Sequence, residues 1–383
     1  MLRDKTTLIA AAVVLAASCV AWAAPSFQGL GDLPGSAYES RGYSVSADGT
    51  VAVGESYSGS GVEAFRWTAA SGIVGLGDLA GGSFVSSGKD VSADGSVVVG
   101  NGYAETNYEA FRWTAGAGMV PLGDLPGGDV DSRAHGVSAD GSVVVGFGTS
   151  ASGQEAYRWT AGTGMVPLGD LPGGTFQSTA WAISADGSAV VGGSQSGSGL
   201  EAFRWTQAEG MVPLGDLAGD GFGSVAWDVS ADGSTVVGYG SSALGNEAFR
   251  WTAGEGMVPL GDLPGGSFGS FARGVSADGS VIVGYSYSDT VTGLEAFVWD
   301  AAHGMRSLAD VLVADCGLDL TGWTLEIAGS ISDDGLTIVG RGLNSAWQTE
   351  GFIATIPEPA TMGLLAAGGA LALLRRRRRR ASA

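Results

Sequence analysis

Carboxylates are the side chains of this 383-residue sequence whose number and spacing could support chemistry. Two suitably placed carboxylates suffice for glycoside cleavage. Most of the 39 acidic residues, however, recur at fixed positions of a repeat, in the strings S-A-D-G, G-D-L and E-A-F-R-W. An active site needs one asymmetric set of groups, so a residue found in every copy is predicted to build the fold. The irregular last copy offers the candidate catalytic set, Asp310, Asp315, Asp319 and Glu326.

Histidine and cysteine add little further chemistry. His135 and His303 lie far apart in the sequence, and no Ser-His-Asp arrangement, zinc-ligand spacing or phosphate-binding loop accompanies them. Cys316 is expected to be a small, buried apolar residue without a disulfide partner. The Asp of S-A-D-G is predicted to form a turn. The Asp of G-D-L is predicted to accept hydrogen bonds within or between units, with calcium as the alternative, so no cofactor or metal is predicted.

Aromatic residues in variable links provide the candidate binding surface. Between copies of the repeat, two links change freely, the one from the second to the third strand and the one after the fourth strand. In a four-stranded meander both links emerge at the same end, where aromatic rings would suit sugar stacking. Unconstrained drift of loops is the alternative explanation. The candidate residues are Tyr103, Tyr108, Phe147, Tyr239, Tyr285 and Tyr287.

A repeat of about 46 residues supplies the elements that position these groups. In its third copy, strands are expected to end at Ser138 and to cover Val143–Val145, Glu155–Thr160 and Met165–Leu171. The continuous apolar run of the second strand predicts burial on both faces. Pro167 places the fourth strand at a sheet edge, because proline cannot donate to a ladder. The Asp of the S-A-D-G turn recurs at residues 48, 94, 140, 186, 232, 278 and, after a longer step, 334.

These features predict an all-β fold, a seven-bladed β-propeller with four-stranded blades. The chain begins with a fourth-strand segment, 27–33, and ends with a third-strand segment, 350–356. The N-terminal strand is therefore expected to join the C-terminal blade and close the ring, which removes exposed sheet edges. Aromatics of the third strand, such as Trp159, are predicted to pack between blades, and Glu155 and Arg158 to pair between blades. A β-solenoid is the alternative fold.

The composition narrows the class of partner. The net charge is -20 and the pI near 4.3, which argues against a nucleic-acid partner because phosphate binding requires a basic surface. Charged residues make up 15% and hydrophobic residues 45% of the chain, which excludes simple disorder. Basic residues are concentrated at the ends, so the body between them is more acidic than the whole chain.

Both ends of the chain have the composition of targeting segments. Residues 1–24 combine a basic start, an apolar run and an Ala-Trp-Ala site, which predicts a Sec-type signal peptide. A transmembrane anchor and a lipoprotein cysteine at Cys19 are the alternatives. Residues 357–383 contain a Pro-Glu-Pro motif, an apolar run and an arginine cluster. The motif is Pro357, Glu358 and Pro359, and the cluster is Arg375, Arg376, Arg377, Arg378, Arg379 and Arg380.

The three parts of the C-terminal segment, in this order, resemble the PEP-CTERM sorting signal of Gram-negative bacteria. The resemblance implies recognition and removal by a membrane protease, exosortase, after transient anchoring in the inner membrane. An ordinary tail anchor is the alternative. The repeats resemble extracellular HAF repeats, with Glu-Ala-Phe or Glu-Ala-Tyr in place of His-Ala-Phe. That resemblance implies an extracellular location rather than an activity.

The sequence thus predicts a signal peptide at 1–24, a propeller at 25–356 and a sorting signal at 357–383. The expected function is that of an exported surface or matrix protein, not an enzyme, which binds exopolysaccharide or envelope components through the variable-loop face. A carbohydrate-active hydrolase or lyase is the first alternative, and a structural spacer is the second. The sequence does not identify the ligand or the oligomeric state.

Overall fold

The computed structural model describes residues 24–35, 37–219 and 221–357. The regular secondary structure of this part of the chain is almost entirely β, with 28 strands, as the sequence predicts. The predicted signal peptide, most of the sorting signal, including Glu358, Pro359 and the arginine cluster, and Cys19 lie outside the described residues.

The strands form groups of four antiparallel strands, which we number 1 to 7 in chain order. Groups 1 to 3 contain β2 (Ser40–Val45), β3 (Val51–Tyr57), β4 (Val62–Thr68), β5 (Gly72–Gly75); β6 (Gly81–Val91), β7 (Val97–Ala104), β8 (Asn107–Thr114), β9 (Gly118–Pro121); β10 (Gly127–Val137), β11 (Val143–Ser150), β12 (Gly153–Thr160), β13 (Gly164–Pro167). Groups 4 to 6 contain β14 (Gly173–Ile183), β15 (Ala189–Ser196), β16 (Gly199–Thr206), β17 (Gly210–Gly215); β18 (Ser224–Val229), β19 (Thr235–Ser242), β20 (Gly245–Thr252), β21 (Gly256–Pro259); β22 (Ser270–Val275), β23 (Val281–Tyr287), β24 (Leu294–Asp300), β25 (Gly304–Ser307). Group 7 contains β26 (Thr324–Ile331), β27 (Thr337–Leu343), β28 (Thr349–Thr355) and β1 (Ser26–Gly29).

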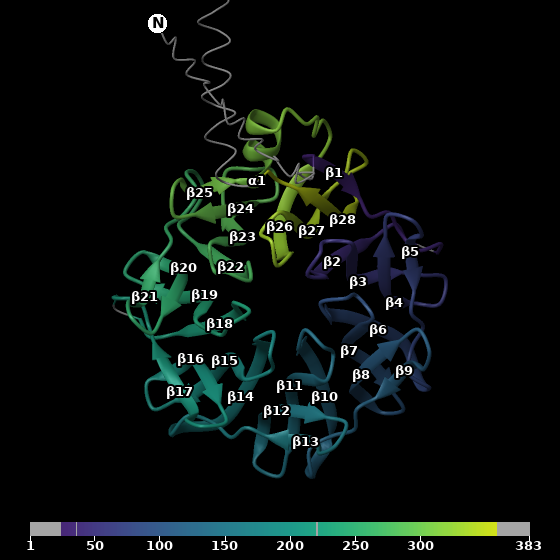
Figure 1. Ribbon diagram of the computed structural model, residues 1–383, viewed down its shortest axis with the longest axis vertical. Coiled ribbons are helices and arrows are strands. Elements are labelled where there is room, and N and C mark those ends of the chain that lie inside the picture. Colours follow the sequence, from purple (N-terminus) through teal and green to yellow (C-terminus); the bar gives the residue numbers. More distant parts are fainter. Residues whose placement is uncertain (1–23, 36, 220, 358–383) are drawn as a thin grey trace, which may run out of the picture.

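The groups surround a common centre, with their first strands innermost and their fourth strands at the rim (Figure 1). Hydrogen bonding assigns them to five sheets, because single parallel bridges join groups 1 and 2 and groups 3 and 4. The fourth strands pair only with the third strand of their own group, for example β13 with β12, which agrees with the edge position predicted from Pro167.

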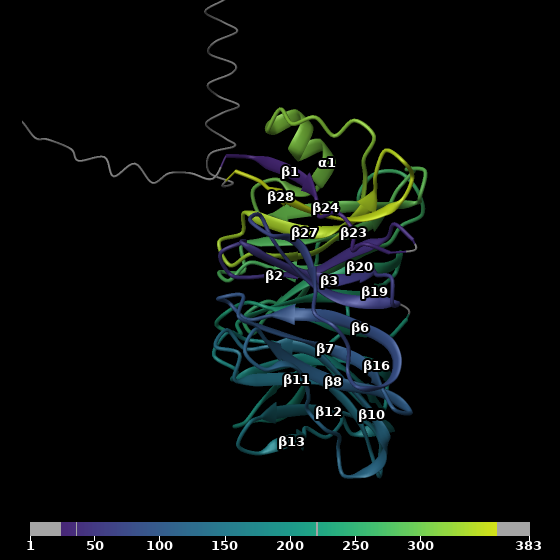
Figure 2. The same cartoon turned by 90° about the vertical axis from the view of Figure 1, so that its right-hand side faces the viewer.

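The first and last strands of the described chain pair as the phase of the repeat predicts. β1 lies antiparallel to β28, with Ser26 opposite Thr355 and Gly29 opposite Phe352. Figure 2 shows both strands beside α1 (Leu308–Asp310), which continues into a π-helical turn, η1 (Val311–Asp315). This short helical element occupies the insertion of the last repeat.

The S-A-D-G strings form the predicted turns. In the first copy, the Asp48 carboxylate accepts hydrogen bonds from the Ser46 hydroxyl and the Thr50 N–H at 2.8 and 3.0 Å. Gly49 has φ 72°, a conformation that glycine adopts without strain. The alanine of each turn then donates its N–H to the corresponding residue of the next turn at 3.0–3.2 Å. The chain of bonds runs through Ala47, Ala93, Ala139, Ala185, Ala231, Ala277 and Asp333, and returns to Ala47.

The core lies between neighbouring groups. One cluster combines Val191 and Ala202 of group 4 with Val236 and Phe249 of group 5. As predicted, Trp159 packs between groups, but it remains partly exposed, and Tyr157 two residues earlier is the fully buried aromatic.

Serines on the first strands add a second set of connections between groups. The Ser86 hydroxyl donates to the Gly77 carbonyl at 2.6 Å and accepts from the Ala64 N–H at 2.9 Å. The same arrangement reaches across the chain ends, where the Gly351 N–H donates to Ser40 Oγ at 3.1 Å.

The predicted pairing of Glu and Arg within E-A-F-R-W is wrong. Arg66 instead donates to the Gly95 carbonyl in the next turn at 3.1 Å, and Glu63 accepts from the Gly77 N–H at 3.0 Å. Glu155 and Arg158, the pair named from the sequence, are not joined by an ion pair among the described residues. Glu63 therefore binds backbone just after the fourth strand of its own group, whereas Arg66 binds a backbone carbonyl of the neighbouring group.

Candidate binding site

A bulge in every first strand directs side chains into the centre of the molecule. In group 1, Gly42 faces Gly54 and Ser44 faces Val53, so Tyr43 has no partner on β3. The same irregularity follows in the other groups, for example between Gly88 and Asp90. Such a bulge bends the strand and turns its extra residue in a new direction. The unpaired residues are Tyr43, Lys89, His135, Trp181, Trp227, Arg273 and Gly329.

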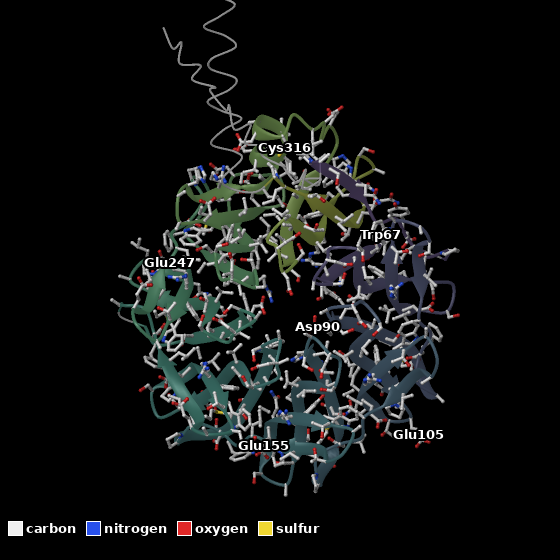
Figure 3. The ribbon with its side chains drawn as sticks, in the orientation of Figure 1. Trp67, Asp90, Glu105, Glu155, Glu247 and Cys316 are labelled. Carbon is white, nitrogen blue, oxygen red and sulfur yellow. The ribbon has the colours of Figure 1, made fainter. Side chains whose placement is uncertain are left out.

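These bulge residues line one cavity of about 350 Å³, which we call the central cup. A volume of this size lies at the lower end of the range of small-molecule sites, about 300–1,000 Å³. Residues that follow the bulges, among them Asp90 and Asp228, and Arg341 from β27 complete the lining. Figure 3 shows Asp90 at the inner side of its group, whereas Glu105, Glu155 and Glu247 lie toward the outside. The repeat thus places a different side chain at each equivalent position around one hollow.

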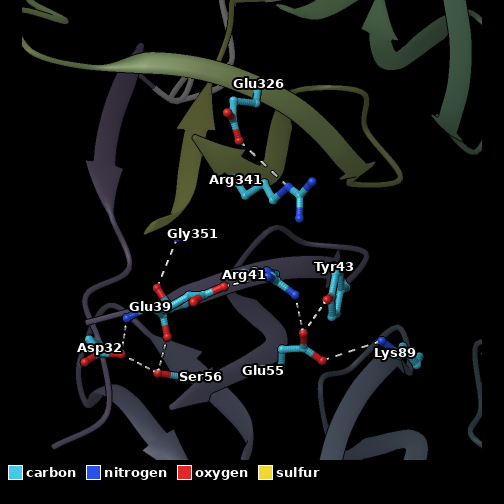
Figure 4. Close-up of polar contacts among 11 residues, drawn as sticks. Asp32, Glu39, Arg41, Tyr43, Glu55, Ser56, Lys89, Glu326, Arg341 and Gly351 are labelled. Carbon is cyan, nitrogen blue, oxygen red and sulfur yellow. Dashed lines mark hydrogen bonds and ion pairs between the residues drawn. The ribbon is translucent and has the colours of Figure 1, made fainter. Parts of the chain in front are cut away.

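One side of the cup carries a carboxylate surrounded by cations (Figure 4). Glu55 accepts from the Tyr43 hydroxyl at 2.7 Å, pairs with Arg41 at 3.0 Å and lies 3.7 Å from Lys89 Nζ. Burial alone would raise the pKa of Glu55, but Lys89, Tyr43 and Arg41 hold it below its usual value. Burial lowers the pKa of Lys89, and Glu55 offsets part of this effect. Glu55 therefore balances much of the positive charge on this side.

The opposite side combines aromatic rings with an arginine that lacks a carboxylate partner. The Arg273 guanidinium carbon lies 3.6 Å from the centre of the Trp227 ring, a close cation–π contact. Phe271 stacks on Tyr285 at 4.8 Å, and Tyr239 packs against Trp227 at 4.9 Å. Among the described residues, no carboxylate lies within 4.0 Å of Arg273, and its buried Nε has no hydrogen-bond partner.

A neutral histidine supports the neighbouring aromatic wall. The His135 ring stacks on Trp181 at 4.2 Å, with the two planes 8° apart. Burial lowers the pKa of His135 to about 3. Its Nδ1 lies 3.1 Å from the Ala180 carbonyl, which only accepts, so Nδ1 carries the hydrogen and Nε2 is an acceptor.

Two buried carboxyl groups form the floor of the cup. Asp90 accepts from the Ser44 hydroxyl at 2.6 Å and from the Val137 N–H of the next group at 2.8 Å. Asp228 accepts in the same way from the Val275 N–H at 2.9 Å. Burial raises the pKa of Asp90 to about 6 and that of Asp228 to about 7. Beyond them lies a second chamber of about 120 Å³, lined by the alanines of the hydrogen-bonded turns.

None of the aromatic residues predicted from the variable links belongs to the lining of the cup, and three of the six contact a lining residue. Phe147, Tyr239 and Tyr285 contact the lining residues His135, Trp227 and Arg273, respectively. Tyr287 is 36% exposed and lies 5.8 Å from Phe271. Tyr103 and Tyr108 contact each other at 5.3 Å, and Arg133 lies over Tyr108.

The two predicted variable links do meet at one end of the groups, as the pairing of Gly81 with Ala104 illustrates. In the links that lead into groups 2 to 4, the residues from Gly81, Gly127 and Gly173 onward belong to β6, β10 and β14, so the later part of these links is strand and not loop.

The bulge residues themselves were missed by sequence reasoning. The signal was present: three residues before each S-A-D-G or S-D-D-G string, the sequence reads Tyr, Lys, His, Trp, Trp, Arg and Gly. Period-two alternation along a strand does not reveal a bulge, so this variation was not connected to a common cavity.

The carboxylates of the last repeat take up separate structural roles. Asp315 pairs with Arg306 at 3.1 Å, Asp319 accepts from the Thr321 N–H at 2.9 Å, and Glu326 lies 4.0 Å from Arg341. Asp310 belongs to α1. Within the described residues, no three His, Cys, Asp or Glu side chains form a group able to hold a metal ion. The Asp of G-D-L accepts backbone hydrogen bonds, as Asp216 does from Leu217 and Gly223.

Cys316 packs partly buried against the core beside the helical element, and burial raises the pKa of its thiol. This environment agrees with the apolar role expected for it. In the part of the chain that the structure describes, no helix is long and apolar enough to cross a membrane.

Comparisons with solved structures show the fold alone. The chain is similar to an oligogalacturonate lyase from Vibrio parahaemolyticus, at 11% identity and a TM-score of 0.53, over 88% of this chain and 98% of that one. It is also similar to the β-propeller domain of the Trilobed protease from Pyrococcus furiosus, at 8% identity and a TM-score of 0.51, over 84% and 95%. TolB from Acinetobacter baumannii matches at 12% identity and a TM-score of 0.46, over 69% of this chain, which spans 64% of that protein. The two similarities with TM-scores above 0.5 support an all-β, propeller-like fold.

Comparison with curated protein sequences gave no match. The family comparison matched residues 355–379 to the PEP-CTERM protein-sorting motif. This motif is a substrate signal for exosortase processing. The chain therefore carries a PEP-CTERM sorting motif and is an exported, surface-directed protein.

Proposed function

We propose that this protein is a non-catalytic surface or matrix protein that binds extracellular polysaccharide, or another envelope component, in the central cup. One observation carries the proposal: a bulge in each first strand brings tyrosine, lysine, histidine, two tryptophans and arginine to one cavity. Flat aromatic faces next to hydrogen-bond donors suit carbohydrates, which present an apolar ring face and polar edges. The aromatic residues of the variable links extend this surface outward.

The proposed scaffold is a closed seven-bladed propeller made of HAF-type extracellular repeats. Each four-strand group is one blade, and β1 completes the blade of the C-terminal strands. The circle of hydrogen bonds through the seven turns and the pairing of β1 with β28 support this arrangement. In such a ring the cup occupies the mouth of the central channel on the side of the variable links.

The proposed route to the surface follows from the two ends of the chain. Residues 1–24 direct export, and the apolar run 360–374 holds the protein in the inner membrane until exosortase acts. The released body then reaches the cell surface or the extracellular matrix. The body of the protein is acidic, so electrostatic attraction would not hold it on a neutral or sparsely charged polysaccharide. Its retention there therefore depends on a specific binding site.

The absence of catalysis is part of the proposal, and it has a chemical basis. The candidate set Asp310, Asp315, Asp319 and Glu326 is divided among separate local interactions. Asp90 and Asp228 have raised pKa values, a frequent property of catalytic acids. Each also caps backbone N–H groups of two neighbouring first strands, which accounts for its position without a reaction.

Retention of the secreted, processed protein on native exopolysaccharide tests this function. The variant Trp227→Ala should elute much earlier than the parent, because it removes an aromatic wall of the cup. Trp347→Ala is the matched control, since that side chain is 68% exposed. Equal retention of all three proteins would remove the cup from the function. Cleavage of the polymer during the same assay would favour the hydrolase or lyase, and no retention at all would favour the spacer.

A further inference from the structure

The basic residues of the body are unevenly distributed. Between residues 25 and 356 the sequence has eleven lysines and arginines. Five of them recur in E-A-F-R-W and one, Arg306, pairs with Asp300 and Asp315. The other five lie on first or second strands: Arg41, Lys89, Arg133, Arg273 and Arg341. Three of them, Lys89, Arg273 and Arg341, line the cup, so an otherwise acidic body places three of its eleven basic residues in one cavity.

These five cations are not balanced equally. Arg41 and Lys89 share Glu55, and Arg133 lies 3.7 Å from Asp131. Arg341 reaches Glu326 only at 4.0 Å, and Arg273 has no carboxylate partner among the described residues. A buried cation without a partner is costly, and an anion that enters beside it removes this cost. The shortage of negative charge is thus concentrated at Arg273 and Arg341.

Both arginines belong to the same wall of the cup. Arg273 and Arg341 both line the cavity. Burial lowers the pKa of the Arg273 guanidinium, and the positive charge of Arg341 contributes in the same direction. The two guanidinium groups repel each other, and an anion bound between them would relieve this repulsion. The planar fork of a guanidinium matches the two oxygens of a carboxylate, which allows paired hydrogen bonds.

The surroundings favour a singly charged sugar acid. Trp181 and Trp227 also line the cavity; His135 covers one face of Trp181 and Arg273 covers one face of Trp227, so the apolar face of a sugar ring would pack against the parts of these rings that remain free. The floor carries the carboxyl groups of Asp90 and Asp228, and when ionised these would repel a doubly charged phosphate more strongly than a carboxylate. When protonated, each could donate a hydrogen bond to a sugar hydroxyl.

We propose that the central cup binds a hexuronate unit of an acidic polysaccharide, with its carboxylate held by Arg273 and Arg341 and its ring against Trp181 and Trp227. This inference rests on the proposed function and specifies its ligand. The neutral sugars of a mixed polymer then contact the aromatic residues of the variable links. The acidic outer surface repels the rest of an anionic chain, so the cup selects one exposed acidic unit rather than a long segment.

Calorimetric titration of the processed protein tests the ligand class. The probes are a trisaccharide of galacturonate, a trisaccharide of mannuronate, cellotriose as the neutral control and glucose 6-phosphate as the phosphate control. At least one uronate should bind at least tenfold more tightly than both controls, and its affinity should fall as salt is added. Stronger binding of cellotriose or of the phosphate than of both uronates would overturn the proposal.

Arg273→Met removes the charge and the cation–π contact with Trp227 but keeps an unbranched apolar side chain at this position. It should weaken uronate binding at least tenfold while leaving the melting temperature close to that of the parent. Arg250→Met is the matched control, because Arg250 lies on the third strand of group 5 and pairs with Glu255 outside the cup. Equal loss in both variants would contradict the assignment. A parent that is retained on native exopolysaccharide but binds neither uronate would overturn this inference and leave the proposed function standing.

Discussion

Two neighbouring parts of each strand group, the bulge in the first strand and the turn that follows that strand, obey different rules. At the turn, alanines such as Ala93 and Ala139 repeat, and their backbone groups bond from one strand group to the next. Four residues earlier, equivalent positions carry side chains as different as Lys89 and Trp181. The backbone circle holds the geometry without help from those side chains. The bulge row is therefore free to build an asymmetric site on a symmetric frame, and this difference can be tested at several points.

The largest effect is expected in the shared scaffold between groups. Phe249 is fully buried between groups 4 and 5, so Phe249→Ala should lower the free energy of unfolding by about 3–5 kcal/mol. Phe222→Ala, the same change at a side chain that is 41% exposed, should cost far less. Denaturant melts of both variants measure the contrast, and similar losses would mean that the aromatic of the third strand is not the scaffold residue.

The next effect concerns Asp228, which lies between the bulge residue and the turn. Its pKa is about 7 when folded, above the ordinary value of 3.8, so the folded protein holds this proton more tightly than the unfolded chain. Stability from this group is fully present below pH 3.8 and is lost as the pH rises through 7; between pH 5 and pH 8 the loss is about 2–3 kcal/mol.

Melts of the parent and Asp228→Asn at pH 5 and pH 8 test this sign. The variant should lose less stability on going to pH 8. Asp232→Asn is the control, because hydrogen bonds within the turn lower the pKa of Asp232 and leave it ionised across this window. The same pH response in the parent and in Asp228→Asn would assign the titration to other groups.

A smaller effect is expected at the turn that follows a first strand. Gly141 has φ 70°, and a Cβ there would lie 2.6 Å from a methyl carbon of Val97 in the neighbouring group. Gly141→Ala should therefore cost about 1–2 kcal/mol of stability. At Gly162 a Cβ would meet nothing within 4 Å, so Gly162→Ala should be nearly neutral in the same melts. If Gly141→Ala left the free energy of unfolding unchanged, the turn would accept a side chain at this position, contrary to the close packing of the turns that the circle of hydrogen bonds implies.

The smallest effect on stability is expected in the bulge row. Trp227 is partly exposed in the cup, so Trp227→Ala should change the free energy of unfolding by about 1 kcal/mol or less. Its effect should fall on retention by native exopolysaccharide instead. A loss of several kcal/mol would make the bulge row part of the scaffold and remove the contrast between the bulge and the turn.

Much of the fold could be predicted because its signals are local and repeated. The S-A-D-G strings specify their turns through Ser, Asp and Gly contacts within five residues. Pro167 and the equivalent prolines of other repeats each mark an edge strand. The phase of the repeat predicted that β1 and β28 would pair. The role of E-A-F-R-W was predicted wrongly because Arg66 finds a carbonyl rather than a carboxylate in the next group, a choice that depends on distance between groups.

The candidate site was less accessible to sequence reasoning. Tyr239 and Tyr285 were selected as members of variable links, and they lie beside the cup, but Trp227 and Arg273 were not selected. A bulge in the middle of a strand leaves no local residue signature when its extra position carries a different side chain in each copy. His135 looked isolated in the sequence because its partner Trp181 is one repeat away.

The repeat, the turns, the edge strands and the sorting motif could be inferred from the sequence because each depends on residues close together in the chain, and the acidity follows from composition alone. Only the assembled structure shows that one residue from each first strand lines a common cavity, that Glu55 pairs with Lys89, and that Arg273 has no carboxylate within 4.0 Å among the described residues. Charge balance and burial depend on distances between groups that are tens to hundreds of residues apart in sequence, and only the assembled strands set those distances.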